Sequence, residues 1–195
     1  GKLDRHVDVL AAIARRAGFA TQINASAALA RHLPAARAPV AKSLLHHRNP
    51  VVRANAAFAL GRLKVAGAKT ALESVLAKDS SWLVRVAAAR ALSRIGGAQV
   101  ALGVAAKDDG NELVREEASR ALEVVFRPDP PKEWRNFLFV DPSTGGSPMA
   151  NRGYVVIGSD GVGMAVYSDA RGEAVVEEFP PGRQWVKPAD RLGEL

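Results

Sequence analysis

The chain has 195 residues, of which 48% are hydrophobic and 24% are charged, and this is the composition of an ordinary globular protein. No stretch approaches the roughly 18 to 20 consecutive apolar residues of a membrane-spanning helix. The absence of cysteine excludes disulfides, thiol catalysis and cysteine-ligated zinc, and it leaves open whether the protein is cytoplasmic or periplasmic.

The net charge of +7 is distributed unevenly along the chain. Residues 1–127 contain 20 Lys and Arg against 10 Asp and Glu, a net charge of +10, whereas residues 128–195 contain 7 against 10, a net charge of −3. A basic segment of this size favours an acidic protein partner or nucleic acid, although a solvated basic surface explains it equally well.

One helical pattern occurs several times in the first 127 residues. The strong copies are NPVVRANAAFALGRL (49–63), SWLVRVAAARALSRI (81–95) and NELVREEASRALEVV (111–125), and TQINASAALARHL (21–33) is a weaker copy. Apolar residues fall four, seven, eight and eleven residues after the first one, which places them in one stripe along an α-helix. We therefore expect helices that begin near residues 20, 50, 82 and 112. The stripe residues of the third helix are expected to be buried: Val84, Ala88, Leu92 and Ile95.

A shorter helix fits before each of these copies. The four segments lie at about residues 4–17, 35–47, 66–77 and 98–107. The result is four antiparallel helical pairs. Because one pair cannot bury its apolar stripe alone, we expect the pairs to stack into an α–α superhelix, or solenoid, over residues 1–127.

The repeated V-R-x-x-A-A-x-A-L pattern, with an aspartate shortly before it, resembles the HEAT repeat. The similarity is greatest to the short repeats of about thirty residues in phycobilin-lyase-like proteins, and it covers residues 4–127. It implies a HEAT-like solenoid of four helical pairs, and such a stacked array offers a long concave surface for binding other proteins. HEAT-like arrays serve many purposes, so this resemblance specifies architecture far better than function.

The resemblance also assigns a structural role to the arginine of the pattern. This arginine occurs three times, as Arg53, Arg85 and Arg115. In HEAT-like repeats such an arginine and an aspartate form a ladder that joins each repeat to its neighbour, and Asp79 and Asp109 match the aspartate. His47 takes the aspartate position before Arg53, so we expect the rung there to be broken or altered. The alternative is that the three arginines form a binding stripe.

A second set of arginines falls on one flank of the repeat helices, outside the apolar stripe. The set comprises Arg31, Arg62, Arg90, Arg94 and Arg120. Stacking of the repeats would align them in a basic strip, which is either a solvated edge or a surface that contacts carboxylates of an acidic protein partner. In the second case, charge reversal of Arg62, Arg90 and Arg94 is expected to weaken partner binding and leave the melting temperature nearly unchanged.

The helical sequence pattern ends at RPDPPKEW (127–134), where three prolines terminate the helical region. Beyond it, alternating apolar residues predict strands at 136–140, 154–159, 163–168, 173–179 and 183–187. We expect residues 128–195 to form a small antiparallel sheet or barrel that contains two consecutive hairpins, with turns at 159–161 and 169–172. So small a core is marginal alone, so we expect it to dock on the end of the solenoid. The polar loop 141–153 is either mobile or a contact loop.

Motifs for catalysis or cofactor binding are weak. GSDGVG (158–163) does not have the G-x-G-x-x-G spacing, and no H-E-x-x-H occurs. His46 and His47 are adjacent, and side chains about 100° apart on a helix cannot bind one metal ion together. We therefore expect no enzymatic activity, no cofactor and no metal site.

These observations favour a non-catalytic protein–protein interaction scaffold with an acidic partner. The second hypothesis is nucleic-acid binding by the basic first half, although residues 1–64 contain only Phe19 and Phe58 as aromatics for base stacking. The third, a bilin-lyase-like enzyme, is suggested only by the resemblance of the repeats.

Overall fold

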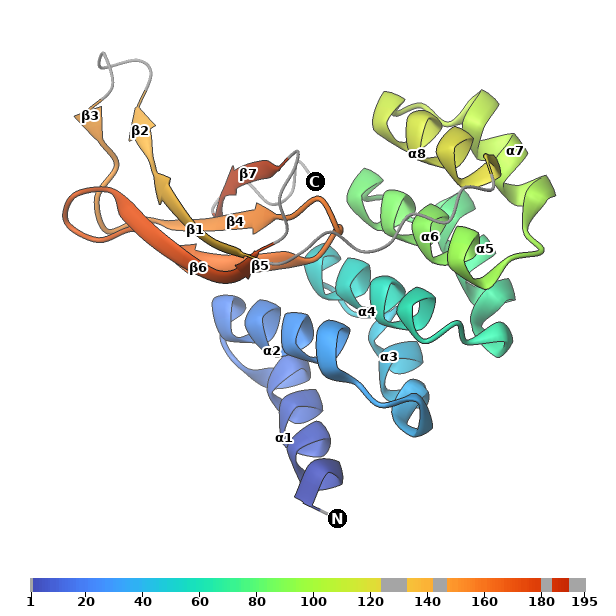
Figure 1. Cartoon of the computed structure of the whole chain (residues 1–195), viewed down its shortest axis with the longest axis horizontal. Helices are drawn as coiled ribbons and strands as arrows, with labels where there is room; N and C mark the ends of the chain where they lie inside the picture. The colour runs from blue at the N-terminus through green and yellow to red at the C-terminus, as the bar shows by residue number, and fades with distance from the viewer. Residues whose placement is uncertain (1, 124–132, 142–146, 180–183, 190–195) are drawn as a thin grey trace.

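The computed structural model describes residues 2–123, 133–141, 147–179 and 184–189. Eight helices follow one another in pairs along an arc, and short antiparallel strands come after them (Figure 1). The predicted fold class, a mainly helical solenoid of four pairs with a small β module, is therefore confirmed.

The helices begin close to the expected residues. Their bounds are α1 Lys2–Arg16, α2 Phe19–His32, α3 Ala38–Leu44, α4 Pro50–Arg62, α5 Lys69–Lys78, α6 Trp82–Ile95, α7 Gln99–Asp108 and α8 Glu112–Leu122. Short 3-10 turns at 35–37 and 66–68 precede α3 and α5. Asn49 and Asn111 act as N-caps, because their side chains accept a hydrogen bond from the backbone N–H two residues later. Ser81 makes no such side-chain bond at the start of α6.

The apolar stripe lies inside the stack. Val84, Ala88 and Leu92 are fully buried, as expected, but Ile95 is only partly buried because it lies in the last turn of α6. The helices approach closely where small residues face each other. A Cβ added to Gly61 of α4 would lie 2.5 Å from the Cα of Ala91 of α6, which real side chains do not tolerate.

The strands of the described residues form three small sheets. Their bounds are β1 Glu133–Leu138, β2 Val140–Asp141, β3 Ser147–Pro148, β4 Gly153–Ile157, β5 Gly163–Tyr167, β6 Glu173–Phe179 and β7 Trp185–Pro188. One sheet has the order β5-β4-β7, and the other two are the pairs β1-β6 and β2-β3. The two-residue strands β2 and β3 were not predicted. β2 lies at the start of the expected loop 141–153, and β3 lies within it. Residues 142–146 of this loop are outside the described residues.

Only the first of the two expected hairpins forms. β4 and β5 pair across the turn at 158–162, whereas β6 pairs with β1 rather than with β5. The turn at 169–172 is present, since the N–H of Asp169 donates to the carbonyl of Glu173. The prediction of a second hairpin was wrong because the outer edge of β5 bonds to the solenoid instead.

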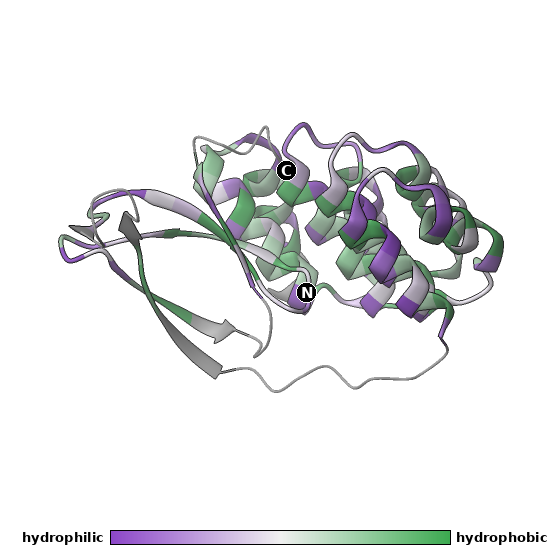
Figure 2. Cartoon of the chain, turned by 90° about the horizontal axis from the view of Figure 1, so that it is seen from above, coloured by the Kyte–Doolittle hydropathy of each residue, from purple (hydrophilic) through white to green (hydrophobic). Residues whose placement is uncertain are grey.

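We expected the β module to dock on the end of the solenoid, but it does not. β5 lies along the second helices of the first two pairs, α2 and α4, and the turn before it reaches α6 (Figure 1). Much of the rest of the β module extends away from the helices (Figure 2). Val155 and Ile157 of β4 and Ala165 of β5 belong to the same apolar core as the helices. The physical reason is that alanine-rich helices present a shallow surface, on which a strand can lie close to the helix backbones.

Candidate interaction site

Two asparagines bind the outer edge of β5 to the solenoid. The side-chain amide of Asn55 in α4 donates to the carbonyl of Gly163 at 3.1 Å and accepts from its N–H at 2.9 Å. Asn24 in α2 makes the same pair of bonds to Ala165, at 3.2 and 3.0 Å. Alternate residues of a strand turn their N–H and C=O groups to the same side, so the two asparagines replace a neighbouring strand.

The two asparagines occupy the same position in successive repeats, 31 residues apart. Asn55 is fully buried, and its amide also donates to the hydroxyl of Ser26 at 2.9 Å. Ser26 in turn donates to the carbonyl of Ile23. A buried polar chain of this kind is stable because each member is hydrogen-bonded.

The turn of the β4–β5 hairpin inserts between the inner helices. Val162 is fully buried in a cluster with Ala27, Ala30 and Phe58. The next residue, Gly163, lies so close to α4 that an added Cβ would be 2.4 Å from Cγ1 of Val51. Glycine is required here because of this approach rather than its backbone angles.

Arg31 and Arg90, two residues of the predicted basic strip, bind this turn. Arg31 is 7% exposed and lies 3.7 Å from the carboxylate of Asp160, which is itself 6% exposed. Arg90 donates to the carbonyl of Ser159 and to Glu117, both at 2.9 Å. The acidic and carbonyl groups that face these two arginines therefore come from the chain itself.

The other three strip arginines differ in their surroundings. Arg62 donates to the carbonyls of Ala30 and Leu33 at the end of α2, at 2.9 and 2.6 Å. The guanidinium of Arg94 lies 5.1 Å from the ring centre of Phe58. Arg120 is 56% exposed and contacts only carboxylates of its own helix, Glu116 and Glu117, among the contacts of the described residues. The strip arginines recur from repeat to repeat, but other parts of the molecule cover most of them. Arg120, in the last helix, is exposed.

The predicted ladder arginines bind aspartates of the following repeat. Arg53 forms two hydrogen bonds to Asp79, at 2.8 and 2.7 Å, and Arg85 forms two to Asp109, at 2.8 and 2.9 Å. Each arginine also donates through Nη1 to the backbone carbonyl six residues earlier. Arg115 makes this bond as well, to the backbone carbonyl of Asp109 at 2.7 Å. Bidentate contacts of this kind fix both distance and orientation between repeats.

Burial tends to raise the pKa of the Asp109 carboxyl, but its bonds outweigh that effect. The hydrogen bonds from Arg85 and from the N–H of Asn111, with the charges of Arg85 and Arg115, hold the pKa below its ordinary value. Asp109 therefore stays ionised, which the rung requires.

His47 takes part of the aspartate role at the first junction. Its Nδ1 accepts from the N–H of Asn49 at 3.0 Å, as Asp79 and Asp109 accept from Ser81 and Asn111. Burial is the main cause that lowers the pKa of His47, and the nearby charges of Arg48 and Arg53 act in the same direction. The neutral imidazole is thereby favoured as an acceptor.

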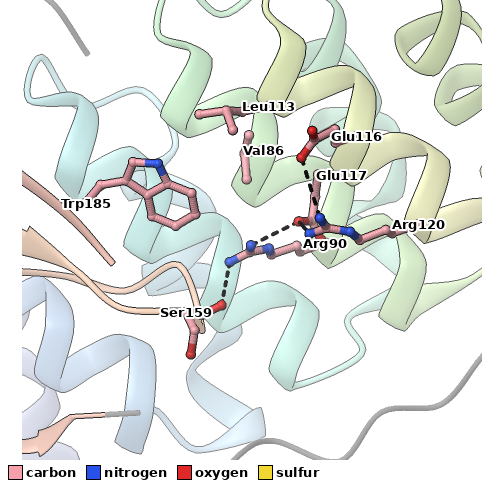
Figure 3. Close-up of a pocket in the computed structure, with 8 residues that line it drawn as sticks. All are labelled: Val86, Arg90, Leu113, Glu116, Glu117, Arg120, Ser159 and Trp185. Atoms are coloured by element: carbon pink, nitrogen blue, oxygen red, sulfur yellow. Dashed lines mark hydrogen bonds and ion pairs between the residues drawn. The ribbon is translucent and has the colours of Figure 1, made fainter. Parts of the chain in front are cut away.

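A cavity of about 180 Å³ opens between the hairpin turn and the last helix (Figure 3). Its walls come from α6, α8, the turn and β7: Val86, Arg90, Leu113, Glu116, Glu117, Arg120, Ser159 and Trp185. Trp185 is fixed by an edge-on contact with Trp82, with ring centres 6.3 Å apart. The indole and Leu113 give the cavity apolar walls, and Arg120 and Glu116 give it a charged rim.

A family model of HEAT repeats matches residues 4–93 and 38–123, which together span more than half of the chain. The chain belongs to the HEAT-repeat family. The repeat resemblance read from the sequence is therefore confirmed. A search of curated proteins gave no match.

In the part of the HEAT protein that the structure describes, no three His, Asp or Glu side chains are grouped to hold a metal ion. No described helix has the length and apolar character to cross a membrane.

The Asn24 and Asn55 contacts were missed from the sequence. The available signal was a polar residue at the same position of two successive alanine-rich repeats.

Proposed function

We propose that this HEAT-repeat protein is a non-catalytic scaffold that binds a partner protein through the inner helices of its solenoid. Support comes from the family, whose stacked repeats offer a long continuous surface, and from the way in which α2 and α4 hold β5. The partner engages the part of this surface that the β module leaves uncovered, at α6 and α8.

The observation that carries the proposal is the pair of amide contacts from Asn24 and Asn55 to alternate residues of β5. They bind main-chain groups, so they recognise an extended polypeptide with little regard to its side chains. The groups that they bind, the N–H and C=O of alternate residues, are those that one edge of an extended polypeptide presents. The inner surface is thus suited to polypeptide, and the β4–β5 hairpin is the segment that occupies its first two repeats.

The next two repeats have different residues at the asparagine position. The corresponding residues, three positions after the valine of the repeat, are Ala87 in α6 and Glu117 in α8. The hairpin ends at α6, and the cavity beside Trp185 and Leu113 begins where the hairpin stops (Figure 3). A partner segment that enters this cavity would continue the track of β5 and bury an apolar residue against the indole.

An acidic partner agrees with the charge of the solenoid. Residues 1–127 have a net charge of +10, of which residues 1–64, with 11 Lys and Arg against 2 Asp and Glu, carry +9. At the cavity itself the exposed cationic side chain is Arg120, which is 56% exposed. Nucleic acid remains the second candidate because of the same net charge, and the experiment below separates the two. Phosphate contacts would make binding fall steeply with salt, whatever the sequence of the nucleic acid.

The test is affinity capture with the full chain as bait, followed by mass spectrometry after nuclease treatment. The variant Arg120→Glu changes the cavity rim, and Arg171→Glu is the matched control, since Arg171 is 77% exposed in the turn before β6. A protein that is retained by the parent and by Arg171→Glu but lost with Arg120→Glu supports the proposal. Equal capture by both variants contradicts the binding site. Material that is released by nuclease, together with a gel shift that weakens steeply between two salt concentrations, contradicts the function itself.

A further inference from the structure

The arginine ladder contains two complete rungs and one open end. In each complete rung, Nε and Nη2 of the arginine bind the two oxygens of an aspartate, and Nη1 binds a carbonyl of the arginine's own repeat. The arginines are 13% and 16% exposed, and the aspartates are 9% exposed. The ladder therefore defines a largely buried site with a fixed geometry for one carboxylate.

Arg115 has the arginine half of this site without the carboxylate. Its Nη1 donates to the carbonyl of Asp109 at 2.7 Å, which is the bond that orients Arg53 and Arg85 in their rungs. Among the described residues, no carboxylate lies on its Nε–Nη2 edge. The side chain is partly buried, so much of the cost of ordering it has already been met.

The first junction of the solenoid gives a comparison within the same chain. The position of the rung arginine is taken there by Gln22, and the position of its aspartate is taken by His47. At this one junction the following repeat supplies no carboxylate, and the chain has no arginine there either. Arg115 differs, because it is an arginine although no further repeat follows α8 in the described chain.

We propose that the Nε–Nη2 edge of Arg115 is a binding site for a carboxylate of the partner protein, presented by an acidic loop that precedes a helix. This inference rests on the proposed scaffold function and identifies the chemistry of its partner. The loop would contact Arg115 as the loop before α8 contacts Arg85, with one aspartate that accepts two parallel hydrogen bonds. The partner would then extend the solenoid by one further layer at its α8 end.

A second copy stacked head to tail does not meet this requirement. The residue of the first repeat that corresponds to Asp79 and Asp109 is Arg16, which is exposed. Stacking α1 and α2 of one copy on α8 of another would place Arg16 near Arg115, and like charges repel. The first helical pair described here is therefore not the occupant, and the occupant that we propose is a different protein with an acidic loop.

The test uses the full chain labelled with ¹⁵N and a synthetic peptide as the probe. The peptide has the sequence of residues 104–123, which carries Asp109 in its natural loop and helix, and its matched control carries Asp109→Asn. The Nε–Hε signal of Arg115 reports binding, and the signals of Arg53 and Arg85 are internal references because their rungs are already filled. Arg115 is assigned with the variant Arg115→Lys, which keeps the charge and removes the bidentate edge.

We expect the aspartate peptide to shift the Arg115 signal and to bind about tenfold more tightly than the asparagine peptide, because charged bidentate bonds are stronger than neutral ones. The selectivity should disappear in Arg115→Lys and persist in Arg120→Gln. Equal affinities of the two peptides, or no shift at Arg115 with peptide up to about 1 mM, overturn the inference.

The two proposals fail in different ways. If capture yields a partner that Arg115→Lys still binds, and the peptides bind equally, the carboxylate site is wrong and the scaffold function stands. If the peptides are discriminated but no protein is captured, the site stands and the scaffold function falls.

Discussion

Asn55 in the fourth helix and Gly163 in the fifth strand are 108 residues apart in sequence, and they are joined by two hydrogen bonds of 2.9 and 3.1 Å. The side-chain amide of Asn55 takes the place of a strand residue. Together with Asn24, it closes an edge of the β5-β4-β7 sheet that would otherwise leave buried main-chain groups unpaired. The solenoid and the β module are thus joined by main-chain recognition and by packing.

The first prediction concerns this contact. Asn55→Ala leaves the N–H and C=O of Gly163 without their partner in a buried site, and each buried unpaired group costs about 1–3 kcal/mol. It also removes the bond that the Ser26 hydroxyl accepts, although Ser26 still donates to Ile23. We expect the free energy of unfolding to fall by about 2–4 kcal/mol. Asn24→Ala should cost less, because Asn24 is exposed and water can replace its amide. Urea unfolding of the two variants measures the difference, and equal losses would contradict the role of burial.

The second prediction compares two glycine-to-alanine substitutions. Gly163→Ala places a methyl group 2.4 Å from Val51, so the strand must move away from α4, at a cost of about 1–3 kcal/mol. Gly103→Ala adds a methyl group in α7 where nothing lies within 4 Å, and the gain in helix propensity is about 0.5–1 kcal/mol. Melting temperatures should therefore move in opposite directions. A neutral Gly163→Ala would mean that β5 does not approach α4 as closely as described.

The fold of the helical part could be read from the sequence because its information is local and repeated. The valine, alanine and leucine of the apolar stripe recur in each of the three strong copies, and the asparagine caps mark two helix starts. The identity of the rung arginines was also accessible through the resemblance to HEAT repeats. The position of the β module could not be predicted from the sequence. It depends on contacts such as that of Asn55 with Gly163, between residues that are far apart in sequence and follow no periodic pattern.

The arginine strip shows a second limit of the sequence. Helical periodicity correctly placed Arg31, Arg62 and Arg90 off the apolar stripe, but periodicity cannot tell whether another part of the chain covers that flank. Asp160 and the carbonyl of Ser159 cover it at Arg31 and Arg90. A charged flank of a helix is therefore informative about a partner only after the intramolecular partners are known.

The third prediction is a dependence of stability on pH through His47. Its pKa in the folded protein is lower than the ordinary value of 6.5, so the unfolded chain binds the proton more readily. The stabilisation is complete above pH 6.5 and is lost as the pH falls below 6.5 toward the lower pKa of the folded state. Protonation of Nδ1 would also break the bond from Asn49. In His47→Asn, which keeps an acceptor that does not titrate, the loss of stability between pH 7 and pH 5.5 should be smaller than in the parent.

The final prediction replaces our expectation that charge reversal in the strip leaves the melting temperature unchanged. Arg62 donates to the carbonyls of Ala30 and Leu33 at the C-terminal end of α2, where the helix dipole is negative. Arg62→Glu removes both bonds and places a negative charge against those carbonyls, so we expect a loss of about 2–4 kcal/mol. Arg120→Glu affects a side chain that is 56% exposed, and its cost should stay within about 0.5 kcal/mol. Thermal unfolding of the two variants separates the arginine that holds the fold together from the one that is available to a partner. Equal melting temperatures would show that the bonds of Arg62 add nothing to stability and would return it to the set of candidate binding residues.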